Sequence, residues 1–332
     1  MIITRTPFRI SFVGGGSDFE EFYSRWPGAV LSTTINKFMY ISTHRFWDEE
    51  IIVAKYSRTE MVKEISQLQH PIIREVLKKF NVTGALEISS NADVGAGTGL
   101  GSSSSFTVGM LHNLYTVFGR FVTKQQLAED ACDIEINQLG EPIGKQDQYA
   151  AAFGGLNIFR FESSGAVTVE PIHLKKEIYK ALEKRLMMFY LGTQRSASAI
   201  LAEQKKNMQM KTAHLEPIRD MVGLVWELRD VLYSGRLEAF GKILHTNWML
   251  KQQLSSMITS SRINDLYDIA LRNGATGGKL LGAGGGGFFL FYCEPEQQER
   301  LRSALATLRE MKFKFENEGS KIIYIGDEYL EH

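Results

Sequence analysis

The feature that most constrains the fold is a run of glycines and serines at residues 95–105, Gly-Ala-Gly-Thr-Gly-Leu-Gly-Ser-Ser-Ser-Ser. Apolar residues recur after it at three- and four-residue spacing from Phe106 to Phe118 and stop at Gly119, which predicts a buried helix beginning near Phe106. Glycine backbone can approach an anion without a Cβ clash, and a helix N-terminus attracts negative charge. The run therefore predicts a phosphate-binding loop, and a flexible loop followed by a serine N-cap is the alternative.

Other phosphate-binding signatures do not fit the sequence. A Walker motif needs Lys-Ser or Lys-Thr after its last glycine, whereas Gly101 is followed by serines, and the segment 140–146 has too few spacers and ends in Gln. The segment Gly282–Gly287 matches a dinucleotide fingerprint in its letters, but it joins two expected strands and opens no helix. We interpret it as a turn that packs closely against a ligand or the other domain, and a plain glycine hairpin is the alternative. The protein-kinase signatures His-Arg-Asp and Asp-Phe-Gly do not occur in the sequence.

Length and the order of expected elements predict an α+β protein of two domains. A chain of 332 residues is too long for one ordinary hydrophobic core. The last third alternates apolar segments typical of strands with a helical pattern at 296–311, which predicts an antiparallel sheet with helices on one face. We place the boundary near residue 185, with domains 1–185 and 186–329. Residues 330–332, Leu-Glu-His, resemble the start of an expression tag.

The remaining expected elements frame the glycine-rich segments. Strands are expected at 2–13, 29–35, 38–46, 156–161, 186–191, 279–281, 288–292 and 321–325. Helices are expected at 124–139, around 147–152, within 196–254 and at 263–272.

Charge and composition exclude several classes of function. Lys plus Arg and Asp plus Glu both number 38, so the chain has no overall positive field for nucleic acid or acidic membranes. The N-terminus lacks a signal segment and no apolar stretch approaches a membrane span, which predicts a cytoplasmic protein. Cys132 and Cys293 have neither metal nor redox spacing and are expected to be buried thiols.

Two acidic residues lie in apolar surroundings. Glu135 shares a face of the expected helix 124–139 with Ala128 and Ala131, and Asp147 lies beside small apolar residues. A carboxylate that projects from an apolar surface needs a partner. Either acid is therefore a candidate for catalysis or metal binding, and a salt bridge in the core is the alternative.

The first expected strand leads into a third glycine-rich segment. It carries Arg9, and Asp18 follows the glycines Gly14–Gly16 directly. An Asp in such a turn is a candidate for binding substrate hydroxyls, whereas turn capping by Asp18 and surface exposure of Arg9 are the alternatives.

Three segments, Pro7–Asp18, Gly95–Ser105 and Lys279–Phe289, together resemble the signatures of the GHMP kinase family in order and approximate spacing. The resemblance covers nearly the whole chain. It implies an N-terminal domain like ribosomal protein S5 domain 2 and a ferredoxin-like C-terminal domain, with ATP and an acceptor bound between them. It also implies that the loop wraps the phosphates of ATP through Gly95, Gly97, Gly99, Leu100, Gly101, Ser102, Ser103 and Ser104.

The same resemblance implies roles for the acidic residues. Ser103, or a neighbouring serine, and Glu135 would coordinate Mg²⁺, while Asp147 would face the acceptor hydroxyl with Arg9 close by. The turn Gly282–Gly287 would close the site.

One departure from the family bears on the substrate. Galactokinases have Gly-Glu-His-Thr-Asp where this chain has Gly-Gly-Gly-Ser-Asp at 14–18, which looks like the D-glycero-α-D-manno-heptose 7-phosphate kinases and related fucokinase domains of the family. The segment 192–196, Gly-Thr-Gln-Arg-Ser, also resembles that subgroup. This implies phosphorylation of a sugar phosphate at its anomeric hydroxyl, giving heptose 1,7-bisphosphate for nucleotide-sugar synthesis.

The resemblance leaves several assignments open. The expected substrate-binding residues are Gly15, Gly16, Asp18, Lys145 and Arg195, with Arg195 holding the sugar's own phosphate and Arg5, Lys37 or Lys145 as alternatives. Alternatives for the function are another GHMP kinase such as a fucokinase or galactokinase, a decarboxylase of the superfamily, and a non-catalytic sugar sensor. The expected partner is a small sugar phosphate, with neither nucleic acid nor membrane, and a homodimer is compatible with this class.

Overall fold

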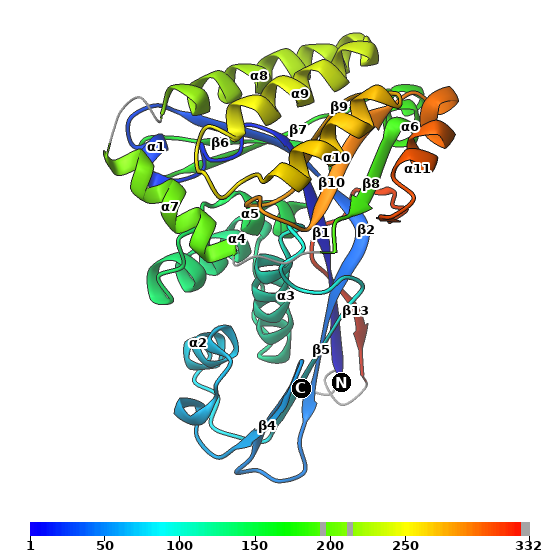
Figure 1. Ribbon diagram of the computed structural model, residues 1–332. Helices are drawn as coiled ribbons and strands as arrows, with labels where there is room; N and C mark the ends of the chain where they lie inside the picture. The colour runs from blue at the N-terminus through cyan, green and yellow to red at the C-terminus, as the bar shows by residue number, and fades with distance from the viewer. Residues whose placement is uncertain (193–196, 211–214, 327–332) are drawn as a thin grey trace.

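The computed structural model describes residues 1–192, 197–210 and 215–326, which form two sheets with helices packed around them (Figure 1). The larger sheet follows the order β13-β1-β2-β5-β3-β4, and β6, β7 and β12 extend it from β2. Its strands are β1 Ile2–Val13, β2 Gly28–Arg45, β3 Ile52–Lys55, β4 Thr59–Val62, β5 Leu86–Ala92, β6 Asn157–Phe161, β7 Val167–Pro171, β12 Phe315–Glu316 and β13 Lys321–Ile325.

One long strand replaces two expected strands in this sheet. The segments 29–35 and 38–46 belong to a single 18-residue strand, β2. Pro7 faces Phe38 while Phe8 faces Ile35, so the residues between Ile35 and Phe38 form a bulge instead of a turn. The bulge lets β2 pair with β6 near one end and with β5 near the other.

In the first unit, the larger sheet with its helices, the Gly/Ser loop leads directly into a helix start. The helices of this unit are α1 Glu20–Tyr23, α2 Pro71–Lys79, α3 Ser102–Val117, α4 Lys124–Cys132, α5 Gln146–Phe153 and α6 Lys176–Arg185, with a 3₁₀ turn at Ile65–Gln67. α3 begins at Ser102, earlier than expected, so the serines form its first turn. The expected helix 124–139 changes after Cys132 into a π-helix, Asp133–Gln138, which carries Glu135.

The second sheet is antiparallel, in the order β11-β8-β10-β9, as the pattern of the last third predicts. Its strands are β8 Leu186–Tyr190, β9 Ala275–Leu280, β10 Phe288–Cys293 and β11 Arg309–Glu310. Its helices are α7 Ala197–Met210, α8 Glu216–Ser234, α9 Phe240–Lys251, α10 Ser261–Arg272 and α11 Gln298–Ala304, with 3₁₀ turns at Leu237–Ala239 and Pro295–Gln297. Trp248, Phe289 and Phe291 are fully or almost fully buried in its core.

The end of the chain returns to the first sheet. We expected the strand 321–325 in the second sheet, but β13 pairs with β1, with Ile2 opposite Ile325 and Arg5 opposite Lys321 (Figure 1). The pairing provides hydrogen-bond partners for backbone groups along the edge of β1. A local sequence pattern does not show which strand supplies these partners. The expected helix 296–311 is also too long, because α11 ends at Ala304. The boundary near residue 185 coincides with the end of α6 and stays a prediction, and residues 330–332 lie outside the described part.

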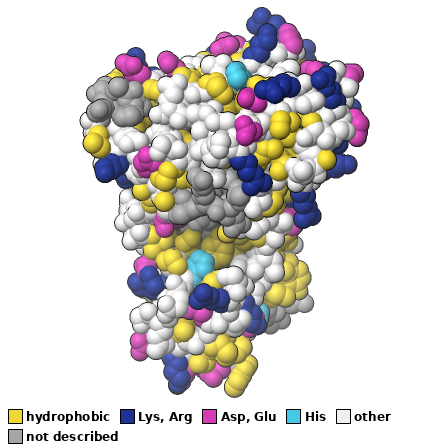
Figure 2. Space-filling model, viewed as in Figure 1, with side chains coloured by type: hydrophobic (Ala, Val, Ile, Leu, Met, Phe, Trp, Pro, Cys, Tyr) yellow, Lys and Arg dark blue, Asp and Glu magenta, His cyan; other side chains and the backbone are white. Residues whose placement is uncertain are grey.

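The surface shows both charge signs. Lys and Arg are scattered among Asp and Glu over the face drawn in Figure 2, which agrees with the equal totals in the sequence. Among the described residues, no helix is long and apolar enough to cross a membrane.

Candidate active site

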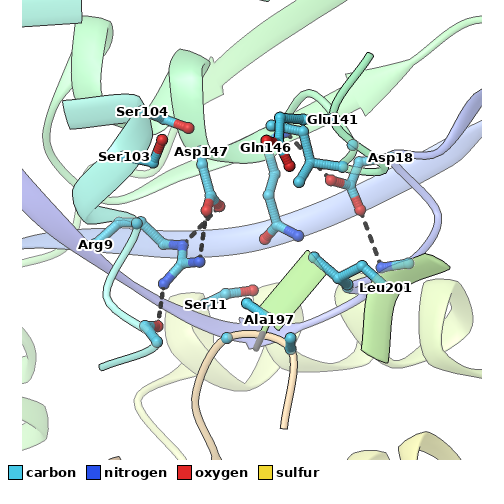
Figure 3. Close-up of a pocket in the computed structure, with 18 of the residues that line it drawn as sticks. Arg9, Ser11, Asp18, Ser103, Ser104, Glu141, Gln146, Asp147, Ala197 and Leu201 are labelled. Carbon is cyan, nitrogen blue, oxygen red and sulfur yellow. Dashed lines mark hydrogen bonds and ion pairs between the residues drawn. The ribbon is translucent and has the colours of Figure 1, made fainter. Parts of the chain in front are cut away.

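A cavity of about 280 Å³ brings together segments from both units. The first unit contributes β1, the turn after it, the Gly/Ser loop, the start of α3 and the start of α5; the second contributes α7, α9, β9 and the turn after β9. Figure 3 shows Arg9 and Asp147 facing one another beside Ser103 and Ser104, with Asp18 toward the other end. Residues from four expected motifs therefore share one cavity.

The Gly/Ser loop lines the cavity through most of its expected residues, Gly97, Gly99, Gly101, Ser102, Ser103 and Ser104. The side chain of Leu100 is buried instead, and its carbonyl accepts a hydrogen bond from the Arg9 amide at 3.0 Å. Gly95 lines a separate cavity of about 490 Å³ together with Thr98. The loop thus separates two cavities.

The two glycine-rich segments touch each other. Gly99 has φ +85°, and a Cβ there would lie 2.5 Å from the Leu281 carbonyl oxygen. A Cβ on Gly287 would lie 2.4 Å from the carbonyl oxygen of Thr98. Only glycine permits this approach. The interpretation of Gly282–Gly287 as a close-packing turn is therefore confirmed, and Gly282 and Ala283 also line the cavity.

Arg9 and Asp147 form a bidentate ion pair. Nε and Nη2 of Arg9 each donate to Asp147 at 2.7 Å, and Nη1 donates to the carbonyl of Gly99 at 2.5 Å. A Cβ on Gly101 would lie 3.4 Å from Oδ2 of Asp147, so this carboxylate borders the loop. The arginine fixes the orientation of Asp147 at the start of α5.

Glu135 is buried and held by neutral donors. Ser103 Oγ donates to Oε1 at 2.6 Å and Gln148 Nε2 donates to Oε2 at 2.7 Å. Burial raises the pKa of Glu135 to about 7; the Asp147 charge adds to this, and hydrogen bonds from Ser103, Ser104 and Gln148 oppose it. In the described ranges, no lysine or arginine forms an ion pair with this carboxylate.

The donor set around Glu135 suits a hard cation. A carboxylate and a hydroxyl are ligands that Mg²⁺ accepts, and Mg²⁺ usually completes its shell with phosphate oxygens and water. The described part of the chain contains no cluster of three His, Cys, Asp or Glu side chains that would hold a metal alone. Ser103 and Glu135 therefore fit a magnesium ion that arrives with a phosphate ligand.

Asp18 caps a turn and lines the cavity as well. Its Oδ1 accepts from the Gly16 amide at 3.0 Å, and its Oδ2 accepts from the Gln146 amide at 3.3 Å. Burial, followed by the nearby Asp147 charge, raises the pKa of Asp18. A Cβ on Gly144 would lie 2.0 Å from Oδ2, so the chain passes very close to this carboxylate. Asp18 thereby links the glycine turn to the helix that carries Asp147.

The other expected substrate residues are distributed differently. Gly15 and Gly16 line the cavity. Lys145 lies in a neighbouring cavity of about 290 Å³, where its Nζ donates to the Gly165 carbonyl at 2.7 Å. Arg195 lies outside the described residues.

Sequence reasoning missed several polar residues that line the cavity, among them Ser11, Gln146, Lys251 and Lys279. Ser11 Oγ and Gln146 Oε1 are buried and have no hydrogen-bond partner within the described ranges. Ser11 could have been found from strand alternation, because it is two residues after Arg9, and Gln146 directly precedes Asp147. Nothing local in the sequence signals that Lys251 and Lys279 meet the other motifs.

Glycine amides at a helix start, a carboxylate fixed beside them and a donor set that fits Mg²⁺ are together suited to phosphoryl transfer, the reaction of a kinase. Residues 64–155 match the N-terminal domain of the GHMP kinases, and residues 226–309 match their C-terminal domain. The chain belongs to the GHMP kinase family and is an ATP-dependent enzyme of that class.

Individual relatives share most of their length with this chain. A D-glycero-alpha-D-manno-heptose 7-phosphate kinase of Campylobacter jejuni is 29% identical over 96% of this chain and 98% of its own. A galactokinase of Pyrococcus furiosus is 25% identical over 95% of this chain and 94% of its own. The crystal structure of a D-glycero-D-manno-heptose 1-phosphate kinase from Bacteroides thetaiotaomicron superimposes with a TM-score of 0.81 at 24% identity, covering 98% of this chain and all of the other. The expected two-domain GHMP fold is confirmed.

Proposed function

We propose that the protein transfers the γ-phosphoryl group of ATP to the anomeric hydroxyl of a sugar phosphate, D-glycero-D-manno-heptose 7-phosphate, giving the 1,7-bisphosphate for nucleotide-sugar synthesis in the cytoplasm. The observation that carries the proposal is Asp147, held by Arg9 at two distances of 2.7 Å and bordering the Gly/Ser loop. The full-length similarity to the heptose 7-phosphate kinase of Campylobacter jejuni supports the choice of sugar.

The polar residues of the cavity suit a sugar. Ser11 Oγ and Gln146 Oε1 are buried without partners in the described chain, so a hydroxyl-rich ligand would satisfy them. Asp18 adds a buried carboxylate to the same cavity, on the side of Gln146 (Figure 3). Asp147 would orient the reacting hydroxyl and accept its proton. Arg195, or Lys145 in the neighbouring cavity, remains our proposal for the sugar's own phosphate.

The other cavity beside the loop suits the nucleoside of ATP. It is bordered by Gly95 and Thr98 and by the aromatic side chains of Tyr190 and Phe288. ATP with its base there would direct its phosphates over the loop toward Arg9. Ser103 and Glu135 would hold Mg²⁺, which shields phosphate charge during transfer.

The test is a panel of acceptors with ATP and Mg²⁺, read by mass spectrometry, with ³¹P NMR to locate the new phosphate. The panel contains heptose 7-phosphate, the same heptose without phosphate, galactose, L-fucose and mevalonate. We expect the highest kcat/KM for heptose 7-phosphate and a phosphate on the anomeric oxygen.

Each alternative gives a different result in the same panel. Preference for fucose or galactose would replace the heptose assignment but keep a sugar kinase. A stable phosphosugar product excludes a decarboxylase. Tight sugar binding without turnover would identify a non-catalytic sensor and overturn the proposal.

A further inference from the structure

Two buried lysines form part of the cavity wall contributed by the second unit. Lys251 is the last residue of α9 and Lys279 lies on β9, and their exposed fractions are 9% and 3%. Nζ of Lys251 donates to the carbonyl of Gly282, and Nζ of Lys279 donates to the carbonyl of Phe12 at 2.9 Å. In the described ranges, neither ammonium forms an ion pair with a carboxylate. A buried charge of this kind is costly unless an anion compensates it.

The neighbouring arginine is already engaged. Three of the five N–H groups of the Arg9 guanidinium donate hydrogen bonds, to Asp147 or to the carbonyl of Gly99, and its charge is paired with Asp147. Arg9 is therefore arranged to hold Asp147 and the loop. Beyond Mg²⁺, a further cation would stabilise the oxygens of a phosphoryl group that passes between the loop and the acceptor.

Lys251 is better placed than Lys279 to supply that cation. The Gly282 carbonyl holds its ammonium, and a Cβ on Gly282 would lie 2.5 Å from Gly99 Cα, so this ammonium lies next to the phosphate loop. An ammonium has three donors, and Gly282 uses one of them. Lys279 is instead anchored to the backbone of β1 at Phe12.

The charges that act on Lys251 come from every element around it. Burial lowers its pKa to about 8, and the charge of Arg9 on β1 contributes in the same direction. Asp18, in the turn after β1, and Asp147, on α5, oppose the shift. Lys279 on β9 lies close to Lys251, and burial, followed by the charges of Lys251 and Arg9, lowers the pKa of Lys279 well below its ordinary value. Both carboxylates that face the acceptor therefore act on the ammonium of Lys251.

We propose that Lys251 is a catalytic residue whose ammonium donates hydrogen bonds to the phosphoryl group during transfer. The inference rests on the proposed kinase function and adds a residue to its site. In the reaction a bond forms between the acceptor oxygen and the γ-phosphorus while the bond from that phosphorus to the β,γ-bridging oxygen breaks. The acceptor proton moves to the carboxylate of Asp147, and ADP leaves. Charge on the transferring oxygens then faces Lys251.

The test compares Lys251→Met and Lys251→Arg with Lys242→Met, an exposed lysine on the same helix. Lys251→Met is expected to lower kcat roughly a hundredfold with little change in KM for ATP or acceptor, because the contact acts in the transition state. We expect the kcat of wild type to fall at alkaline pH as Lys251 loses its proton, and Lys251→Arg should recover part of the rate without that fall, since arginine stays protonated. Lys242→Met should match wild type.

A binding measurement separates this role from a structural one. Magnesium, ADP and aluminium fluoride mimic the planar phosphoryl group, and their joint affinity should fall in Lys251→Met while the affinity for ADP alone is kept. Unchanged aluminium fluoride affinity would overturn the proposal. A raised KM limited to phosphorylated sugars, with kcat intact, would also overturn it and assign Lys251 to the acceptor's own phosphate.

Two controls separate the loss of the Lys251 contact from a folding defect and from a failure of the proposed function. Thermal unfolding of each variant reports on folding, and Lys251→Gln replaces Lys251→Met if the latter is unstable. If wild type phosphorylates no sugar in the panel, the proposed function fails by itself, while the aluminium fluoride measurement still tests Lys251.

Discussion

The two walls of the cavity treat charge in opposite ways. On the first unit's wall, Asp147 is paired with Arg9, and Glu135 accepts hydrogen bonds from Ser103 and from Gln148. On the second unit's wall, Lys251 and Lys279 each reach only one backbone carbonyl among the interactions recorded for the described chain. The first wall is arranged before any ligand enters, whereas the second wall holds two buried amino groups whose protonated form an anionic ligand would stabilise. Groups that orient the acceptor need fixed geometry, and groups that face the phosphoryl oxygens need N–H donors that are still free.

Removing the carboxylate of the first wall should have the largest effect. Asp147→Asn keeps the shape of the side chain but loses the charge and the proton acceptor. We expect turnover to fall on the order of a hundredfold or more, with ATP affinity nearly unchanged. Steady-state kinetics and a nucleotide titration measure the two quantities.

The matched control is Asp220→Asn, an exposed carboxylate on α8. Full activity in Asp147→Asn would remove this residue from the mechanism and would leave the first wall without its central group.

A substitution that forces the two walls apart should have the next largest effect, measured on the free energy of unfolding. Gly99→Ala would put a Cβ 2.5 Å from the Leu281 carbonyl oxygen at φ +85°, so strain and overpacking should together lower the free energy of unfolding by about 3 kcal/mol. Gly95→Ala is the matched control, because no atom lies within 4 Å of its Cβ position, and its effect should stay within about 0.5 kcal/mol. Urea unfolding measures both. Equal effects at the two glycines would show that contact between the walls contributes little stability.

Lowering the pH should reduce the free energy of unfolding through His112, and this is the smallest of the three expected effects. His112 on α3 lies with Nδ1 3.0 Å from Ser320 Oγ, and burial lowers its pKa to about 4. The folded protein thus favours neutral histidine, so its contribution is complete above the unfolded pKa of about 6.5 and is lost as the pH falls toward 4. Between pH 7 and pH 5 the loss should be about 2 kcal/mol.

The variant His112→Gln isolates this contribution. Glu135, whose raised pKa of about 7 acts in the opposite direction over this range, is present in both proteins, so the difference between them is the quantity to compare. Urea unfolding of both at pH 7 and pH 5 gives that difference. A wild type no more acid-sensitive than His112→Gln would exclude the effect.

Local sequence predicted the positions of most helices and strands well and the pairing of distant segments poorly. The loop before α3 and the strand with Arg9 follow from glycine spacing and from alternation, which act over a few residues. The merger of two expected strands into β2 and the pairing of β13 with β1 depend on partners far along the chain. The expected helix 296–311 is too long because its periodic pattern does not show that residues 309–310 pair with β8.

The sequence by itself determined that a glycine-rich loop opens a helix and that acidic residues follow on neighbouring helices, because backbone freedom and helical periodicity are local properties. Only the tertiary structure decided which charges meet. Arg9 pairs with Asp147 across 138 positions of the chain, and Lys251 reaches Gly282 across 31. Coulomb and hydrogen-bond energies depend on distances in space, which the packing of the two sheets sets.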